Sequence, residues 1–85
     1  DAESRVRTLR RAGLERARAM LEAAPELVRE DPVLGFDLGE VYELLALHEE
    51  AASQLQAALG RAPDHPAAAE AVATLSMALN SGKRW

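Results

Sequence analysis

Small residues at core-facing positions of a helical segment constrain the fold of this chain most. In "DLGEVYELLALHEEAASQLQAALGRAP", residues 37–63, strong helix formers predominate, yet Gly39 and Ala51 fall on the apolar stripes. Glycine inside a helix costs about 1 kcal/mol relative to alanine, so its presence needs a compensating reason. A close helix crossing supplies one, because small side chains let two backbones approach. The segment therefore predicts a closely packed helical pair.

Apolar residues recur at spacings of three and four along the whole chain, and no alternating strand pattern interrupts them. The core must be built mainly from Leu, Val and Ala, because the chain has 18 alanines and only three aromatic residues, Phe36, Tyr42 and Trp85. Its 85 residues allow one small domain. Cysteine is absent, which excludes disulfides and thiolate chemistry. The sequence predicts an all-α fold.

About five helices are expected, at 2–12, from Leu14 to about Val28, at 32–46, at 48–61 and at 66–80. Gly13 is expected to break the helical run between the first two helices, and Pro25 is expected to kink or end the second helix. Asp31 followed by Pro32 has the composition of a helix start, and Pro66 is expected to open the last helix. Connections this short favour antiparallel neighbours.

Seven residues within one 34-residue window, 32–65, follow a fixed set of spacings. They are Leu38, Gly39, Tyr42, Ala51, Leu55, Ala58 and Pro63. This set resembles the signature of the tetratricopeptide repeat (TPR) family. The resemblance implies that Gly39 and Ala51 lie where the two helices of a repeat cross, and that Pro63 ends the second helix.

Two positions depart from the family pattern. Gly35 stands where the family usually has Trp, which predicts looser packing on the preceding helix, and Ala46 replaces the usual turn glycine. One repeat length upstream, Ala17, Leu21 and Ala24 correspond to Ala51, Leu55 and Ala58.

The resemblance implies antiparallel helix pairs stacked as a short right-handed α-solenoid. Residues 1–31 would form a degenerate pair, 32–65 a well-matched repeat, and 66–85 either a capping helix or the first half of a further repeat. The fifth helix is expected to pack its face bearing Val72, Leu75 and Leu79 partly on the fourth helix and partly on a further partner, and Trp85 is expected to begin another helix. Because about three repeats are needed for stability, we expect this chain to be part of a longer TPR array or of a larger assembly.

No residue pattern indicates catalysis. His48 and His65 are far apart in the chain and lack carboxylates at metal-ligand spacing, so the first is expected to pack and the second to cap a turn or face solvent. No glycine-rich phosphate loop occurs. We expect a protein that is not an enzyme, with no metal and no cofactor. The sequence indicates no compartment, and it contains no apolar run near the ~20 residues that span a bilayer.

In TPR arrays the first helices of successive pairs line a concave groove that holds a partner peptide or helix. The positions that correspond to this groove are Val33, Phe36, Asp37, Glu40, Glu43, Leu44, Glu70, Thr74 and Met77. The family's chaperone-binding members carry Lys and Asn there, which clamp the terminal carboxylate of their ligand. Here the matching positions within 32–46 are apolar or acidic, so a ligand of that class is disfavoured. Apolar residues among carboxylates suit an amphipathic segment with basic residues. The resemblance thus implies a scaffold or adaptor for protein–protein interaction. The alternatives are a solvated face, or an assembly subunit that stabilises a larger complex through its ends and convex surface.

Charge is distributed unevenly. Residues 1–18 carry six Arg against three acids, a net +3, whereas residues 19–80 carry eleven acids against two Arg, a net −9. The basic segment is expected to be solvated, with pairs such as Glu15–Arg18 at helical spacing, or to contact an acidic protein surface. Nucleic acid is disfavoured, because no aromatic residue interleaves these arginines as a stacking platform.

Overall fold

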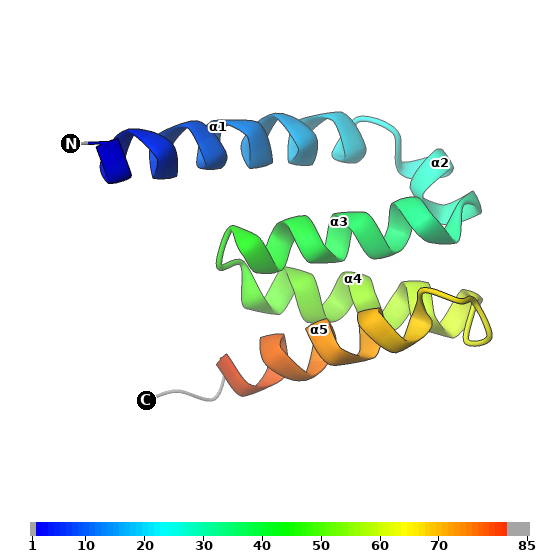
Figure 1. Cartoon of the computed structure of the whole chain (residues 1–85). Coiled ribbons are helices and arrows are strands. Elements are labelled where there is room, and N and C mark those ends of the chain that lie inside the picture. Colours follow the sequence, from blue (N-terminus) through cyan, green and yellow to red (C-terminus); the bar gives the residue numbers. More distant parts are fainter. Residues whose placement is uncertain (1, 82–85) are drawn as a thin grey trace.

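The computed structural model describes residues 2–81, and this part of the chain is all-helical (Figure 1). Its five helices are α1 (Ala2–Glu22), α2 (Pro25–Glu30), α3 (Pro32–Leu44), α4 (His48–Arg61) and α5 (Ala68–Ser81). No strand occurs among the described residues. The antiparallel α3 and α4 form the main pair, and α5 packs on both of them (Figure 1). The all-α prediction, the pairing of the third and fourth helices and the packing of the fifth on the fourth are confirmed.

The helix break expected at Gly13 was wrong. Residues 2–22 form one continuous helix, α1, so the two helices expected in this region do not pair with each other. The reason is that one glycine costs about 1 kcal/mol, which a long run of Arg, Leu, Ala and Glu tolerates. The break occurs instead before Pro25, which starts the short helix α2 at its first position.

The start of α3 is as predicted, whereas its end differs from the prediction. The Asp31 side chain accepts a hydrogen bond from the Val33 N–H at 3.0 Å and caps the helix. At the other end, the Leu47 N–H donates to the Tyr42 carbonyl at 2.8 Å and the Ala46 N–H donates to the Glu43 carbonyl at 2.9 Å. These two bonds are those of a Schellman motif. They end α3 at Leu44 rather than at residue 46.

The Schellman turn places Ala46 in the left-handed region, with φ of 62°. A residue with a Cβ atom is destabilised by about 1–2 kcal/mol in this region. Replacing it with glycine removes that cost, but the greater flexibility of glycine in the unfolded chain lowers the gain in stability by about 0.4–1 kcal/mol. Ala46→Gly is therefore expected to stabilise the chain by about 0.5–1 kcal/mol in denaturant unfolding. Ala57→Gly, on the exposed side of α4, is the control and should destabilise by about 1 kcal/mol. Equal losses from both substitutions would contradict the assignment.

Two glycines one turn apart create the close approach of α3 to α4. A Cβ atom on Gly39 would lie 2.5 Å from Cγ of Leu55, and one on Gly35 would lie 3.1 Å from Cβ of Ala58. Gly39 therefore faces α4 as predicted, although its neighbour is Leu55 rather than Ala51. The looser packing on the preceding helix expected at Gly35 was wrong, because a Cβ atom on this buried glycine would also lie 3.4 Å from the carbonyl oxygen of Val28 in α2.

The core lies where α3, α4 and α5 meet. Its buried cluster consists of Phe36, Leu55, Ala58, Ala68 and Ala71. Helix α5 begins at Ala68 rather than Pro66, and its buried residues are Ala68, Ala71 and Ala78. Val72 and Leu79, which were expected to be covered only in part by the fourth helix, are 50% and 42% exposed, whereas the burial of Ala71 and Ala78 was not predicted. The close packing against α3 and α4 selects small side chains. Trp85, expected to open a further helix, lies outside the described residues.

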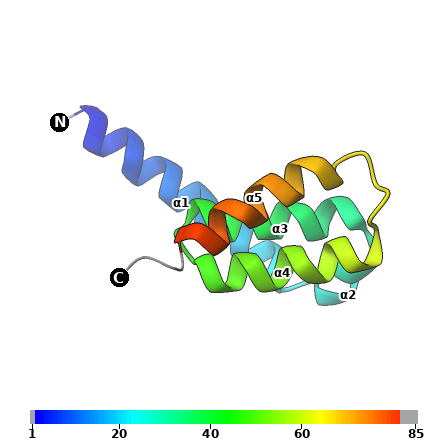
Figure 2. The same ribbon diagram turned by 90° about the horizontal axis from the view of Figure 1, so that it is seen from below.

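Helix α1 packs on α3 only through its second half. The helix has no buried residue, and every residue from 2 to 12 is exposed. Figure 2 shows the first half of α1 projecting away from the other helices. The partly buried residues begin at Gly13 and include Ala17 and Leu21.

Candidate functional site

Six of the nine predicted groove residues line one cleft between α3 and α5. They are Val33, Phe36, Asp37, Glu40, Glu70 and Thr74. Leu55, Ala67 and Ala71 also line it. Its volume is about 50 Å³, which has room for a water molecule or two but not for a large side chain. A partner segment is therefore accommodated over this cleft rather than inside it.

The cleft combines a closed floor with an acidic rim. Phe36 is only 6% exposed and meets the His65 ring edge to face, at 5.6 Å between centroids, so it belongs to the floor. Asp37 and Glu40 from α3 and Glu70 from α5 are exposed. Val33 is 44% exposed and adds an apolar contact at the first turn of α3. The residues lining the cleft include no Lys or Arg.

Three predicted groove residues do not line the cleft. Glu43 has its Oε1 atom 2.8 Å from Nδ1 of His48, across the turn between α3 and α4. Leu44 and Met77 are 61% and 55% exposed and lie further along their helices. Of the two roles expected for His65, capping and solvent exposure, the structure shows capping, because its Nδ1 accepts a hydrogen bond from the Ala67 N–H at 3.0 Å.

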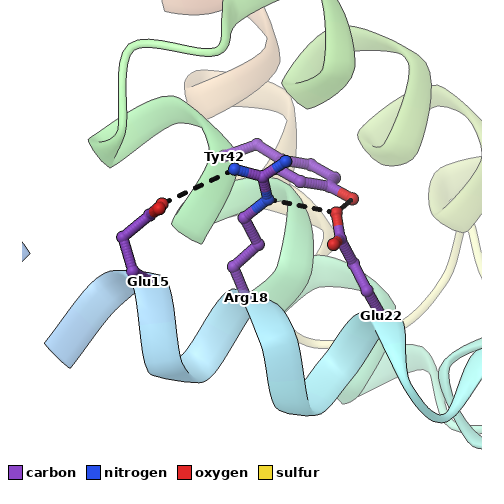
Figure 3. Close-up of polar contacts among 4 residues, drawn as sticks. All are labelled: Glu15, Arg18, Glu22 and Tyr42. Carbon is purple, nitrogen blue, oxygen red and sulfur yellow. Dashed lines mark hydrogen bonds and ion pairs between the residues drawn. The ribbon is translucent and has the colours of Figure 1, made fainter. Parts of the chain in front are cut away.

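A polar link between α1 and α3 was missed by the sequence analysis (Figure 3). The Tyr42 hydroxyl donates to Oε2 of Glu22 at 2.6 Å, and Nε of Arg18 donates to the same oxygen at 3.2 Å. Arg18 also pairs with Glu15 at 3.6 Å, as the helical spacing predicted. Glu22 and Tyr42 are twenty residues apart, so no local pattern indicates their contact.

This link shifts two pKa values. Burial of Tyr42, and its hydrogen bond to the Glu22 carboxylate, raise the pKa of the hydroxyl to about 12. The same hydrogen bond lowers the pKa of Glu22. Each shift favours the form seen in the structure, a neutral phenol donating to a charged carboxylate.

The Tyr42 shift is directly measurable because Tyr42 is the one tyrosine of the chain. Tyrosinate absorbance of the folded chain is expected to rise with a midpoint near pH 12, against about 10 for the denatured chain. A raised pKa means that the contribution to stability is complete below about pH 10 and is lost as the pH rises through the folded value. Glu22→Gln should lower the midpoint only part of the way, since burial remains. A folded midpoint near 10 would contradict the link.

A larger hollow, of about 330 Å³, lies between the α1–α2 segment and the α3–α4 pair. Its lining residues are Leu21, Glu22, Pro25, Val28, Arg29, Leu38, Tyr42, Gln54 and Arg61. The sequence analysis did not indicate it, because it depends on how α1 and α2 dock. Within residues 2–81, no three His, Asp or Glu side chains are grouped closely enough to hold a metal ion. None of the described helices has the length and apolar character needed to cross a membrane.

In comparisons with known proteins, the chain matches no protein-family model, no curated protein and no solved structure.

Proposed function

We propose that this chain is a non-catalytic protein–protein interaction module that holds an amphipathic, basic partner segment across the α3–α5 face. The observation that carries the proposal is the convergence of three exposed carboxylates, Asp37, Glu40 and Glu70, around one cleft with Val33 at its edge. Carboxylates from two separate helices give a linear basic segment several points of attachment.

The chemistry of this face fits a helix laid along it. Apolar side chains of such a segment would cover Val33 and, further along, Leu44 and Met77, which are all more than two-fifths exposed. Removing that surface from water supplies the affinity, whereas the carboxylates orient the partner and raise its association rate. Docking of an amphipathic helix on an apolar surface is a recurring mode of peptide recognition.

The proposal includes a TPR-like arrangement of the helices. It is supported by the closely packed α3–α4 pair, in which Ala51, Leu55 and Ala58 are at most 2% exposed and Gly39 faces Leu55. Pro63 follows shortly after the end of α4 at Arg61. In this arrangement α1 takes the place of the second helix of a preceding repeat, and α5 that of the first helix of a following one.

Charge reversal on two helices tests the binding face. Peptides selected from a displayed random library on the wild-type chain are expected to be basic and amphipathic. Glu40→Lys/Glu70→Lys should weaken their binding at least about tenfold, because like charges then face each other across the contact. Isothermal titration calorimetry measures the change.

The matched control is Glu30→Lys/Glu49→Lys. It makes the same change in net charge, and like the test pair it includes one acid from the first turn of a helix, Glu49 for Glu70. Its peptide affinity should stay within about twofold of wild type, because long-range effects of exposed charges are screened. Equal losses from the two pairs would overturn the assignment of the face.

A structural role is the second candidate, and exposed apolar residues at the two ends of the helical stack favour it. On α1, Val6, Leu9 and Met20 are 56%, 65% and 73% exposed, and on α5, Val72 is 50% exposed. Apolar surface of this kind often marks an interface. If Val72→Glu with Leu79→Glu reduces the size of the native assembly in sedimentation, and Glu40→Lys/Glu70→Lys does not, the structural role holds.

A further inference from the structure

The projecting half of α1 is itself an amphipathic, basic helix. Ala2, Val6 and Leu9 recur at spacings of four and three, so they share one stripe of the helix, and Val6 and Leu9 are more than half exposed. At about 100° per residue, Arg5 and Arg10 flank this stripe on its two sides. An open hollow beside the stripe is lined by Ala2, Glu3, Val6, Arg7 and Arg10, all on α1, so one acid, Glu3, lies among the arginines.

This stripe has the properties that the α3–α5 face requires of a partner. Apolar Val6 and Leu9 correspond to the exposed Val33, Leu44 and Met77, and the flanking arginines to the carboxylates of the cleft rim. The net charges of the two segments that carry these surfaces are also opposite, +3 for residues 1–18 and −9 for residues 19–80. The two surfaces are complementary in charge and both are uncovered in the single chain.

The two surfaces of one chain do not reach each other. Helix α1 packs on α3, held by the Tyr42–Glu22 hydrogen bond, while α5 packs on α4 and α3. Figure 1 shows α1 and α5 separated by the α3–α4 pair. Because α1 is a continuous helix up to Glu22, its first half cannot bend back over the cleft.

We infer that the projecting half of α1 docks on the α3–α5 face of a second copy of this chain. The inference rests on the proposed function, since it names the occupant of the same face. Each copy offers one stripe and one face, so the contact either closes as a two-fold pair or continues head to tail. Half a helix covers less than the roughly 800 Å² per partner of a stable interface, so a single contact is weak and closure of the pair strengthens it.

Two charge-reversed forms of the full chain test the inference. The first, named here the stripe variant, carries Arg5→Glu and Arg10→Glu. The second, the cleft variant, carries Glu40→Lys and Glu70→Lys. Sedimentation at about 0.01 M salt, where the Debye length is roughly 30 Å, is expected to show self-association of the wild type and at least about tenfold weaker association of each variant alone.

Mixing the two variants is the decisive arm. The mixture pairs the unchanged stripe of the cleft variant with the unchanged face of the stripe variant, and pairs the two reversed surfaces with each other. Association is therefore expected to return in the equimolar mixture. Arg7→Glu/Arg11→Glu makes the same charge change on the same helix but outside the stripe and its two flanking arginines. Because charges are weakly screened at this Debye length, it should weaken self-association somewhat, but clearly less than the stripe variant does.

Three results would overturn the inference. A wild-type chain that stays monomeric at low salt removes the second copy as occupant. Association that persists in both variants excludes the contact between stripe and face, and association that disappears with Val72→Glu instead places the contact on the outer side of α5. Association lost equally with Arg7→Glu/Arg11→Glu reduces the effect to net charge. In each case, loss of basic-peptide binding with Glu40→Lys/Glu70→Lys remains a separate measurement, so the proposed function stands or falls on its own.

Discussion

Gly39→Leu is expected to lower the free energy of unfolding by about 2–3 kcal/mol. A Cβ atom at this position already lies 2.5 Å from Cγ of Leu55, and the remaining side chain adds to the overlap. Leu55 is 1% exposed within the core cluster, and the cleft that it lines has a volume of only about 50 Å³, too small to take up its displaced side chain. Overpacking costs about 1–3 kcal/mol and occasionally more, and an overlap that begins at the Cβ atom places Gly39→Leu at or above the upper end of that range. About 2–3 kcal/mol therefore remains after the helix propensity gained, about 1 kcal/mol, is subtracted.

Thermal unfolding followed by circular dichroism measures this effect. For a domain of this size, 2–3 kcal/mol corresponds to a fall in Tm of roughly 10–20 °C. Gly13→Leu is the matched control, because Gly13 is also inside a helix but a Cβ atom placed on it would meet no neighbouring element within 4 Å. That substitution is expected to raise the Tm slightly. Equal effects at the two glycines would show that Gly39 does not face Leu55.

Leu55→Ala is expected to cost about 3 kcal/mol. Leu55 belongs to the core cluster with Phe36, Ala58, Ala68 and Ala71, so its removal leaves a cavity between α3, α4 and α5. Large-to-small core substitutions of leucine cost about 2–5 kcal/mol, depending on how far the surroundings relax. Small alanine neighbours cannot reach into the space, which favours the middle of that range. Denaturant unfolding at equilibrium gives the value.

The effects of Leu55→Ala and of a smaller substitution at the facing glycine, Gly39→Ala, should not be additive. In the Leu55→Ala background the space opposite Gly39 is open, so Gly39→Ala is expected to gain stability there, whereas it loses stability in the wild-type chain. Coupling of this sort is seen between residues in direct contact. Leu59→Ala provides the comparison, because Leu59 is partly buried and packs against the same cluster. A cost of Gly39→Ala that is the same in all three backgrounds would contradict the contact.

Local sequence signals predicted the middle of the fold best. The fourth helix was predicted at 48–61 and is found at His48–Arg61, with Ala51, Leu55 and Ala58 buried as expected. The prediction succeeded because each end of α4 carries a break, the turn at Ala46 on one side and Pro63 on the other. Where one residue competed against a long helical run, at Gly13, the local signal gave the wrong result.

The orientation of α5 depended on packing rather than on hydrophobicity. Val72 and Leu79 are the more apolar side chains, yet Ala71 and Ala78 face the core because α5 lies close to its neighbours. Closeness is a property of the assembled helices and is not visible in one helix. The same holds for the Tyr42–Glu22 hydrogen bond, which depends on the way α1 docks on α3.

The groove was assigned from the resemblance to TPR arrays, and helical spacing supplied the residues that share its face on each helix. Val33, Asp37 and Glu40 share one face of α3 and do meet Glu70 and Thr74 at one cleft. Glu43 lies to the side of that face, where the turn brings His48 within 2.8 Å of it. Phe36 is drawn into the core because the chain has few other large side chains to fill it.

Mapping of a bound peptide by NMR tests the central claim most directly. A basic amphipathic peptide selected on the wild-type chain would be titrated into the isotopically labelled chain, and backbone amide shifts would be followed. The account predicts that the largest changes occur along the exposed face of α3 and α5, at Val33, Asp37, Glu40, Glu70 and Thr74. Changes concentrated instead at Arg29 and Arg61, in the hollow beside α2, would contradict it.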